Sequence, residues 1–182
     1  YSAHYRPRTQ SFPKIFNFGR FDSAYLTIVT EILRPYGDKQ KAFDRRYLQM
    51  ALIWACNSYC IRRQVGALIV KGKMIISDGY NGTPSGFENV CEDENNVTLP
   101  YVLHAEANAI TKVAKSNNSS EDSTLYVTTS PCMECAKLII QSGIRRVVYC
   151  NRYHKTDGLD LLKRAGIELV FIDLENDIYE IQ

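Results

Sequence analysis

Two periodicities in the placement of apolar residues divide the first part of the chain into elements. Over residues 43–60 apolar side chains recur at helical spacing, which predicts an amphipathic helix. The runs 65–70 (VGALIV) and 74–80 (MIISDGY) have the composition of strands, and the Lys-Gly-Lys between them predicts a tight turn. We therefore expect a helix followed by a β-hairpin. A polar stretch at 81–100 comes next, and a loop of that length in a compact domain is usually functional or mobile.

Helical and strand patterns alternate in the rest of the chain. Helices and short apolar strands are predicted in turn at 104–115, 124–129, 132–143, 145–150, 158–166 and 167–172. Because a helical crossover between two apolar strands makes those strands parallel, these segments extend the antiparallel hairpin into a mixed sheet. The sequence therefore predicts an α/β fold with a mixed five-stranded sheet flanked by helices.

The first 43 residues differ from the remainder of the chain. They are irregular in pattern, apart from a short amphipathic helix predicted over 22–35 and ended by Pro35. We expect two regions: an N-terminal extension at 1–43, whose role the sequence leaves open, and a single domain at 44–182.

Composition narrows the class of protein. The chain has 182 residues, of which 45% are hydrophobic and 23% charged, as in ordinary globular domains. Its formal net charge of +2 gives no reason to expect a broad basic surface for the backbone of a nucleic acid. No apolar run approaches the roughly 20 residues that cross a bilayer, and no secretory signal pattern opens the sequence. We therefore expect a cytoplasmic protein with no membrane partner.

Six cysteines are present, and two of them form a tight Cys-x-x-Cys pair, Cys132 and Cys135. Together with the length of the chain and the lack of a signal, this spacing favours reduced thiols and a metal site over a disulfide framework, as expected in the cytoplasm. We expect Cys56 and Cys60 to pack in the core and Cys91 to be a plain thiol.

Residues suited to metal binding and proton transfer are found at the starts of two successive predicted helices: His104 and Glu106 at one, and Pro131, Cys132 and Cys135 at the other. Two helix N-termini at one edge of a sheet can bring an imidazole and two thiolates to one point. That ligand set suits Zn²⁺, and the positive end of a helix dipole favours the thiolate form of cysteine. The sequence therefore predicts a zinc site.

The predicted site has only three protein ligands, which leaves the fourth tetrahedral position of zinc open for water, whereas a structural site is usually closed. Zinc makes hydroxide available at neutral pH, and Glu106 is then placed to move the proton. Taken singly, His104 could be an ordinary helix histidine and Glu106 a solvated acid that complements the helix dipole. Their combination with Pro-Cys-x-x-Cys favours a catalytic site.

The H-x-E and P-C-x-x-C motifs together are the signature of zinc deaminases. From about residue 44 to 173 the chain resembles the cytidine and deoxycytidylate deaminase superfamily, with most similarity to its deoxycytidylate (dCMP) branch. The similar stretches are RRQVGALIV, SDGYNGTPSGFENVC, YVLHAEANAI, TLYVTTSPCMECAKLIIQSGI and RRVVYCNRYHKTDGLDLLKRAGIE. The resemblance implies a three-layer, cytidine-deaminase-like fold and the hydrolysis of dCMP to dUMP and ammonia, which feeds thymidylate synthesis. Residues 1–43 do not resemble the family.

The resemblance also implies roles for particular residues. One catalytic Zn²⁺ per subunit would be bound by His104, Cys132 and Cys135, with Glu106 as the proton shuttle between water, N3 of cytosine and the departing amine. Five residues would contact the substrate: Val65 lines the base pocket, Asn81 holds the sugar, the Ala105 N–H holds the base O2, the Ser130 carbonyl receives the exocyclic amine, and Tyr153 packs against the pyrimidine. A core valine, a turn asparagine and an exposed loop tyrosine are the alternative interpretations of Val65, Asn81 and Tyr153.

Phosphate and effector sites are implied less sharply. The candidates for the substrate phosphate are Arg62, Arg63, His154 and Lys155, although a solvated charge is the commoner fate of each. Regulation by dCTP and dTTP in the family, with Mg²⁺ accompanying the nucleotide, makes effector candidates of Gly79, Tyr80 and Gly82. A tight hairpin end is the other reason for such glycines. The family resemblance also implies a homo-oligomer, with a hexamer as the expected form.

Two further expectations concern residues outside these sites. Arg145 and Arg146 are expected to be surface or interface charges. Since some relatives have a second, structural metal, Cys91 is a candidate ligand for one. No fourth ligand for such a metal is evident in the sequence, so the plain thiol is preferred.

Two other functions compete with a small-nucleotide deaminase. A nucleic-acid base deaminase, of the tRNA adenosine or polynucleotide cytidine type, would also contain H-A-E and P-C-x-x-C, but the GYNGTPSG stretch and the low net charge favour a small nucleotide. Free-nucleoside cytidine deaminases usually have cysteine where this chain has His104. An inactive deaminase-like zinc-binding subunit is the second rival, and Glu106 beside an open coordination position argues against it.

Overall fold

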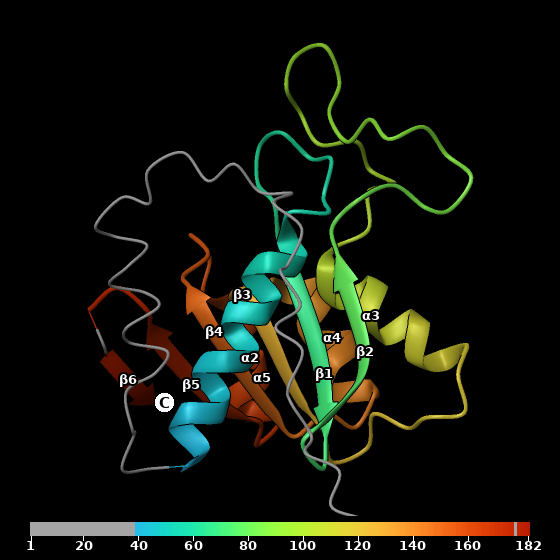
Figure 1. Ribbon diagram of the computed structural model, residues 1–182. Coiled ribbons are helices and arrows are strands. Elements are labelled where there is room, and N and C mark those ends of the chain that lie inside the picture. The colour runs from blue at the N-terminus through green and yellow to red at the C-terminus, as the bar shows by residue number, and fades with distance from the viewer. Residues whose placement is uncertain (1–38, 177) are drawn as a thin grey trace, which may run out of the picture. The chain divides into compact units, whose positions relative to one another are not determined.

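A computed structural model of the protein describes residues 39–176 and 178–182. Within these residues the centre is a six-stranded sheet with the strand order β2-β1-β3-β4-β5-β6 (Figure 1). The strands are β1 (Gly66–Lys71), β2 (Met74–Tyr80), β3 (Thr124–Thr129), β4 (Arg146–Asn151), β5 (Glu168–Asp173) and β6 (Ile178–Ile181). The helix predicted over 22–35 lies outside the described residues, so the extension at 1–43 stays a prediction.

The sheet is mixed, as predicted. β1 pairs antiparallel with β2 and with β3, whereas β3, β4 and β5 run parallel to one another. Each parallel pair is joined through a helix, because the chain must cross back along the sheet before it can begin a parallel neighbour. The α/β class and the order of elements from residue 66 to 173 are therefore confirmed.

The predicted number of strands, five, is wrong by one. Ile178–Ile181 forms β6, which pairs antiparallel with β5 and places Ile181 opposite Val170. The segment has four residues and mixes apolar with polar side chains, most of them exposed. So short an edge strand contains too little apolar periodicity to be recognised, and its hydrogen bonds to β5 decide its conformation.

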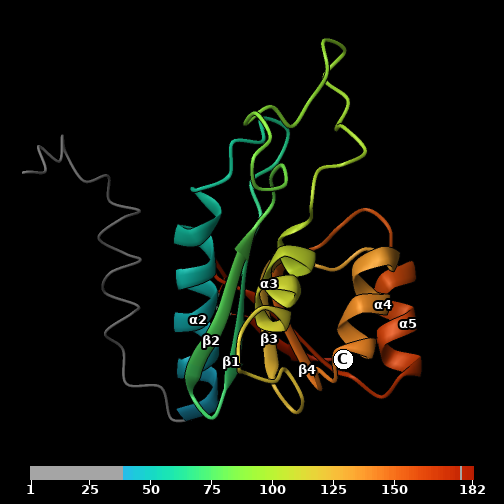
Figure 2. The same ribbon diagram turned by 90° about the vertical axis from the view of Figure 1, so that its right-hand side faces the viewer.

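Helices cover both faces of the sheet (Figure 2). α2 (Lys39–Ala55) packs on one face, and α3 (Ala105–Ala114), α4 (Met133–Gln141) and α5 (Asp157–Arg164) pack on the other. This is the three-layer arrangement that the family resemblance implies. None of the described helices is long and apolar enough to cross a membrane.

Helix α2 begins and ends earlier than the sequence pattern predicts. It starts at Lys39, where lysine, glutamine and alanine residues have high helix propensity. At its other end the N–H groups of Cys56, Asn57 and Ser58 bond to carbonyls three residues back, which tightens the last turn and ends the helix. The chain then enters the segment 58–65, which reaches the cavity described below.

Two clusters of buried side chains hold the layers together. Strand β3 contributes to both, because successive side chains of a strand point to opposite faces. Tyr126 packs in the cluster under α2 with Leu48 and Val148. Leu125 and Val127 pack in the cluster under α3, α4 and α5. The central strands are consequently apolar on both faces, as a sheet covered on both sides requires.

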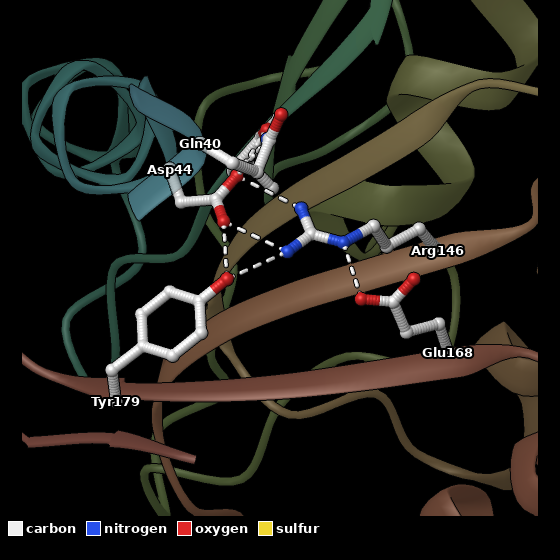
Figure 3. Close-up of polar contacts among 6 residues, drawn as sticks. Gln40, Asp44, Arg146, Glu168 and Tyr179 are labelled. Atoms are coloured by element: carbon white, nitrogen blue, oxygen red, sulfur yellow. Dashed lines mark hydrogen bonds and ion pairs between the residues drawn. The ribbon is translucent and has the colours of Figure 1, made fainter. Parts of the chain in front are cut away.

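A polar network is buried between α2 and the sheet (Figure 3). Both carboxylate oxygens of Asp44 accept hydrogen bonds of 2.8 Å from the Arg146 guanidinium. The Tyr126 and Tyr179 hydroxyls donate to the same carboxylate, and Arg146 also donates to Glu168. The expectation that Arg146 is a surface or interface charge is wrong, because its side chain is only 13% exposed and pairs with a fully buried carboxylate.

A disulfide joins Cys60 to Cys91 and so links the segment after α2 to the long loop after β2. The expectation of reduced thiols is therefore wrong for this pair, and Cys91 is not a plain thiol. The two cysteines are 31 positions apart, and their contact depends on how two loops meet, which sequence spacing does not reveal. The prediction that Cys56 packs in the core is also wrong, since Cys56 is exposed and its thiol is free.

Candidate active site

His104 and Cys132 occupy equivalent positions at the starts of α3 and α4. Each is the N-cap residue and has an extended backbone, with φ −74° and ψ 156° for His104 and φ −76° and ψ 173° for Cys132. Neither side chain forms a capping hydrogen bond with its own helix, which leaves the imidazole and the thiol free to face each other. Cys135, in the first turn of α4, adds a second sulfur on the same side.

These three side chains converge on one point. Nδ1 of His104 lies 3.5 Å from Sγ of Cys132 and 3.4 Å from Sγ of Cys135, and the three ligand atoms all lie within 4.8 Å of one another. A tetrahedral ion with zinc–nitrogen distances of about 2.0–2.1 Å and zinc–sulfur distances of about 2.3 Å would separate nitrogen from sulfur by roughly 3.5 Å. The spacing and the chemistry of the donor set therefore fit Zn²⁺.

Hydrogen bonds within this cluster shift the pKa values of its members. Bonds from Cys135 and His104 lower the pKa of Cys132 to about 3. The same contacts with Cys132 raise the pKa of Cys135 and the pKa of His104. One thiolate is thus stabilised within the protein at neutral pH, which favours the capture of a cation.

Glu106 is buried two residues after His104, with only 4% of its surface exposed. Burial raises the pKa of its carboxyl, while its own backbone N–H and the charge on His104 oppose that shift. A carboxyl with a raised pKa can hold and release a proton nearer neutral pH, as a general acid and base must. Glu106 lines the same cavity as His104 and Cys132, so it can exchange protons with a molecule bound there.

Two glycines let the chain pack closely against the segments that contain the candidate ligands. A side chain at Gly79 on β2 would collide with the backbone of α3, the helix that follows His104. A side chain at Gly158 on α5 would collide with the backbone of Pro131 and Cys132. Gly79, an effector candidate implied by the family resemblance, therefore has a packing role that explains why no side chain is present there.

A cavity of about 270 Å³ lies beside the candidate metal centre. All five residues predicted to bind substrate are part of its lining: Val65, Asn81, Ala105, Ser130 and Tyr153. The effector candidates Gly79, Tyr80 and Gly82 are not among the described residues that line it. The structure thus brings the predicted substrate residues together with the metal cluster and leaves the effector candidates apart.

Asn81 holds one wall of the cavity. Its Oδ1 accepts a hydrogen bond of 2.7 Å from the N–H of Val65, and its Nδ2 donates one of 2.8 Å to the carbonyl of Arg63. The amide therefore fixes the segment that enters β1. One N–H and one lone pair of the amide remain for another partner, which is compatible with the predicted contact to a sugar.

Ser130 holds another wall. Its hydroxyl oxygen accepts a hydrogen bond of 2.7 Å from the N–H of Tyr153, and its own N–H donates one of 2.8 Å to the carbonyl of Asn151. The loop after β4 is thereby tied to the loop after β3. Tyr153 and His154 border the cavity from this loop, with their ring centroids 4.1 Å apart.

Charged residues surround the part of the cavity formed by the loops. Arg62, Arg63 and His154, predicted as phosphate candidates, belong to the lining, whereas Lys155 is not among the described lining residues. Glu92 also lines the cavity and was not predicted from the sequence. Its neighbours in the stretch CEDENN have the same chemistry, so only its burial in the folded protein distinguishes it.

Comparison with known proteins connects these motifs to one family. The chain matches the model of the cytidine and deoxycytidylate deaminase zinc-binding region over residues 41–151. The deoxycytidylate deaminase of Enterobacteria phage T4 is 33% identical over 172 aligned positions, covering 71% of this chain and 89% of the phage protein. The deoxycytidylate deaminase of Saccharomyces cerevisiae is 34% identical and covers 82% of this chain, but the chain spans only 53% of the yeast protein.

A solved structure has the same architecture. The dCMP deaminase of the cyanophage S-TIM5, determined in complex with dCMP and dUMP, is 43% identical and superposes with a TM-score of 0.70. The match covers 76% of this chain and 100% of the cyanophage chain. The fold of this chain is therefore that of a structurally characterised relative.

Proposed function

The chain belongs to the cytidine and deoxycytidylate deaminase family and is an enzyme that deaminates dCMP, and we propose that it hydrolyses dCMP to dUMP and ammonia with a bound Zn²⁺. The observation that supports this mechanism best is the buried carboxyl of Glu106 in the same cavity as the cluster of one histidine and two cysteines. The cluster alone would bind a metal, and the carboxyl adds the group that can move protons.

His104, Cys132 and Cys135 would hold the Zn²⁺. Bound there, the ion would supply a water molecule activated at neutral pH. Three protein ligands is the number found in catalytic zinc sites, whereas structural sites generally have four. One Zn²⁺ per subunit is therefore proposed.

Glu106 would move the protons of the reaction. Its carboxylate takes one proton from the attacking water and delivers it to N3 of the cytosine ring, which makes C4 more electrophilic. It then transfers the second proton to the exocyclic nitrogen, so that the C4–N bond breaks and ammonia leaves. The ring keeps the oxygen at C4 and the proton at N3, which is uracil. A pKa raised by burial suits both transfers.

The base would be held by residues that line the cavity beside the metal cluster. Ala105 is the first residue of α3, so its N–H has no partner within the helix and is available to the base O2. The Ser130 carbonyl would accept a hydrogen bond from the exocyclic amine. Val65 and Tyr153 would contact the faces of the pyrimidine.

The sugar and the phosphate would extend toward the loops. Asn81 has hydrogen-bonding capacity left for a sugar hydroxyl. Arg62, Arg63 and His154 line the cavity and would compensate the charge of a 5′-phosphate. Arg63 also lies over the Tyr153 ring, 5.9 Å from its centroid, so the residue that would bind phosphate contacts the residue that would cover the base.

The proposal includes a cellular role and an assembly. The dUMP would supply thymidylate synthesis in the cytoplasm. A homo-oligomer, with a hexamer as the expected form, is supported by apolar side chains on α2 that the described residues leave exposed, among them Met50, Ile53 and Trp54. Regulation by dCTP and dTTP, with Mg²⁺ accompanying the effector, stays a prediction from the family.

One assay tests the substrate. Zinc-loaded protein is incubated separately with dCMP, CMP, dCTP, deoxycytidine and a tRNA anticodon stem, and ammonia release is followed. Release from dCMP ahead of the other four supports the proposal. Release from the RNA alone would favour the nucleic-acid deaminase, and bound zinc without any turnover would favour the inactive subunit.

A further inference from the structure

Glu92 is an acidic side chain buried where two loops meet at the cavity. It is 8% exposed and lies in the long loop between β2 and α3. A buried carboxylate is costly unless hydrogen bonds compensate its lost hydration. Its partners therefore indicate what the side chain does.

Both oxygens of Glu92 bond to the backbone of the other loop. Oε2 accepts a hydrogen bond of 3.2 Å from the N–H of Ile61, and Oε1 accepts one of 3.2 Å from the N–H of Arg62. One carboxylate thus holds two consecutive peptide groups, about 30 positions away in the sequence. Such charge-assisted bonds are stronger than those between neutral groups.

Neighbouring contacts hold the two loops together on either side of the Glu92 hydrogen bonds. The disulfide between Cys60 and Cys91 joins the residues just before Ile61 and just before Glu92. Glu92 also pairs with Thr98 across its own loop, and the Thr98 hydroxyl accepts a hydrogen bond of 3.1 Å from Arg62. The segment with Arg62 is therefore held through its backbone and through its side chain.

The segment that Glu92 holds contributes positively charged residues to the lining of the cavity. Arg62 and Arg63 both line it, and Asn81 holds the Arg63 carbonyl from the other direction. Glu92 holds the N–H of Arg62 and Asn81 holds the carbonyl of Arg63, so the backbone of these two residues has little freedom to move. The Glu92 carboxylate therefore holds the backbone from which the Arg62 side chain extends.

We propose that Glu92 is a positioning residue for recognition of the 5′-phosphate: it holds the Ile61–Arg62 backbone so that Arg62 and Arg63 face the phosphate end of the bound nucleotide. This inference rests on the proposed function, because it assumes a nucleoside monophosphate in the cavity. Glu92 acts through the arginines and takes no part in the chemistry at C4.

The sign of the effect separates positioning from simple electrostatics. As a nearby negative charge, Glu92 repels phosphate, so its neutralisation would tighten phosphate binding. As a positioning residue, Glu92 must accept hydrogen bonds from two backbone N–H groups. In Glu92→Gln one of these N–H groups meets an amide NH₂, so phosphate binding should weaken. The two roles predict opposite changes.

The test uses the zinc-loaded full chain with Glu92→Gln and, as a matched control, Glu94→Gln, which removes an exposed charge from the same loop. The KM and kcat for dCMP and the Ki values of dUMP and deoxyuridine are measured. In Glu92→Gln we expect KM for dCMP and Ki for dUMP to rise about tenfold, the loss of roughly one charge-assisted bond. We expect kcat and the Ki of deoxyuridine to change less than about twofold, and Glu94→Gln to behave as the wild type.

Glu92→Asp provides a second variant, since it keeps the charge but shortens the reach. Weaker phosphate binding in this variant supports the positioning role of Glu92, and unchanged binding contradicts it. Tighter dUMP binding in Glu92→Gln, or an equal loss for dUMP and deoxyuridine, would overturn the proposal. Zinc content and deoxyuridine binding in the same preparations show whether each variant is folded. Absence of dCMP turnover in the wild type would refute the proposed function instead.

Discussion

The carboxylate of Asp44 and the guanidinium of Arg146 form a bidentate pair across 102 positions of sequence, with two hydrogen bonds of 2.8 Å. Asp44 lies on α2 and Arg146 begins β4, so the pair fastens the helix of one layer to the sheet. Burial alone would raise the pKa of Asp44, but hydrogen bonds from Arg146, Tyr126 and Tyr179 outweigh it and lower that pKa. The network therefore stabilises the fold.

Replacing Asp44 by Asn should destabilise the protein strongly. The change leaves Arg146 as a largely buried charge without its main partner, which typically costs about 3–5 kcal/mol. Urea denaturation measures this directly, while KM for dCMP should stay near the wild-type value. The matched comparison is Arg146→Met against Arg145→Met. Arg145 is 62% exposed, so its replacement should change the free energy of unfolding by less than about 0.5 kcal/mol.

The contribution of Asp44 should disappear in acid. Its pKa in the folded protein is lowered from the ordinary value of 3.8, so the stabilisation is fully present above that value and is lost as pH falls through the lower folded pKa. The difference in unfolding free energy between wild type and Asp44→Asn should therefore be constant from pH 7 to pH 5. It should shrink below pH 4. A difference that stays constant into strong acid would contradict the ionised pair.

Glu106→Gln should keep the metal and lose turnover. The amide is nearly isosteric but cannot transfer protons, and general acid–base groups contribute about 10²–10⁴-fold to rate. Zinc content and kcat for dCMP are measured on the same sample. Glu134→Gln is the control, because Glu134 is an exposed acid in the first turn of α4. Substantial activity in Glu106→Gln would refute the shuttle.

Removing the metal should abolish activity reversibly. A strong chelator should reduce dCMP turnover below detection, and added Zn²⁺ should restore it. Cys135→Ser should bind less than one Zn²⁺ per chain even with excess metal, because a hydroxyl replaces one of three ligand groups. Cys56→Ser, which changes an exposed free cysteine, should retain full zinc content. Activity that persists after complete removal of zinc would contradict the mechanism.

Gly158→Ala should disturb the metal site from a distance. The added methyl group would overlap the backbone of Pro131 and Cys132, so α5 or the ligand loop must shift. We expect weaker zinc binding and a loss of stability of about 1–3 kcal/mol, as for other overpacked sites. Zinc competition with a chromogenic chelator measures the first and urea denaturation the second. Asp160→Ala, an exposed change on the same helix, should leave both near the wild-type values.

Within single elements, the order of residues determined a large part of this protein. The strands β2 and β3 lie at their predicted bounds, because turn residues delimit each of these short segments along the chain. The H-x-E and P-C-x-x-C motifs likewise indicated the type of metal and the reaction. Cys132 and Cys135 lie about one helical turn apart and share a face, so the two thiols can be interpreted together from spacing alone.

Contacts between distant segments were decided only by the tertiary structure. Three such contacts were not predicted: the Asp44–Arg146 ion pair, the Cys60–Cys91 disulfide and the hydrogen bonds from the Ile61–Arg62 backbone to Glu92. Nor was β6, whose conformation depends on the edge of β5. Periodicity records which side of an element is buried, but it contains no information about the partner on that side. The partner follows from strand order and loop paths, which exist only once the whole chain has folded.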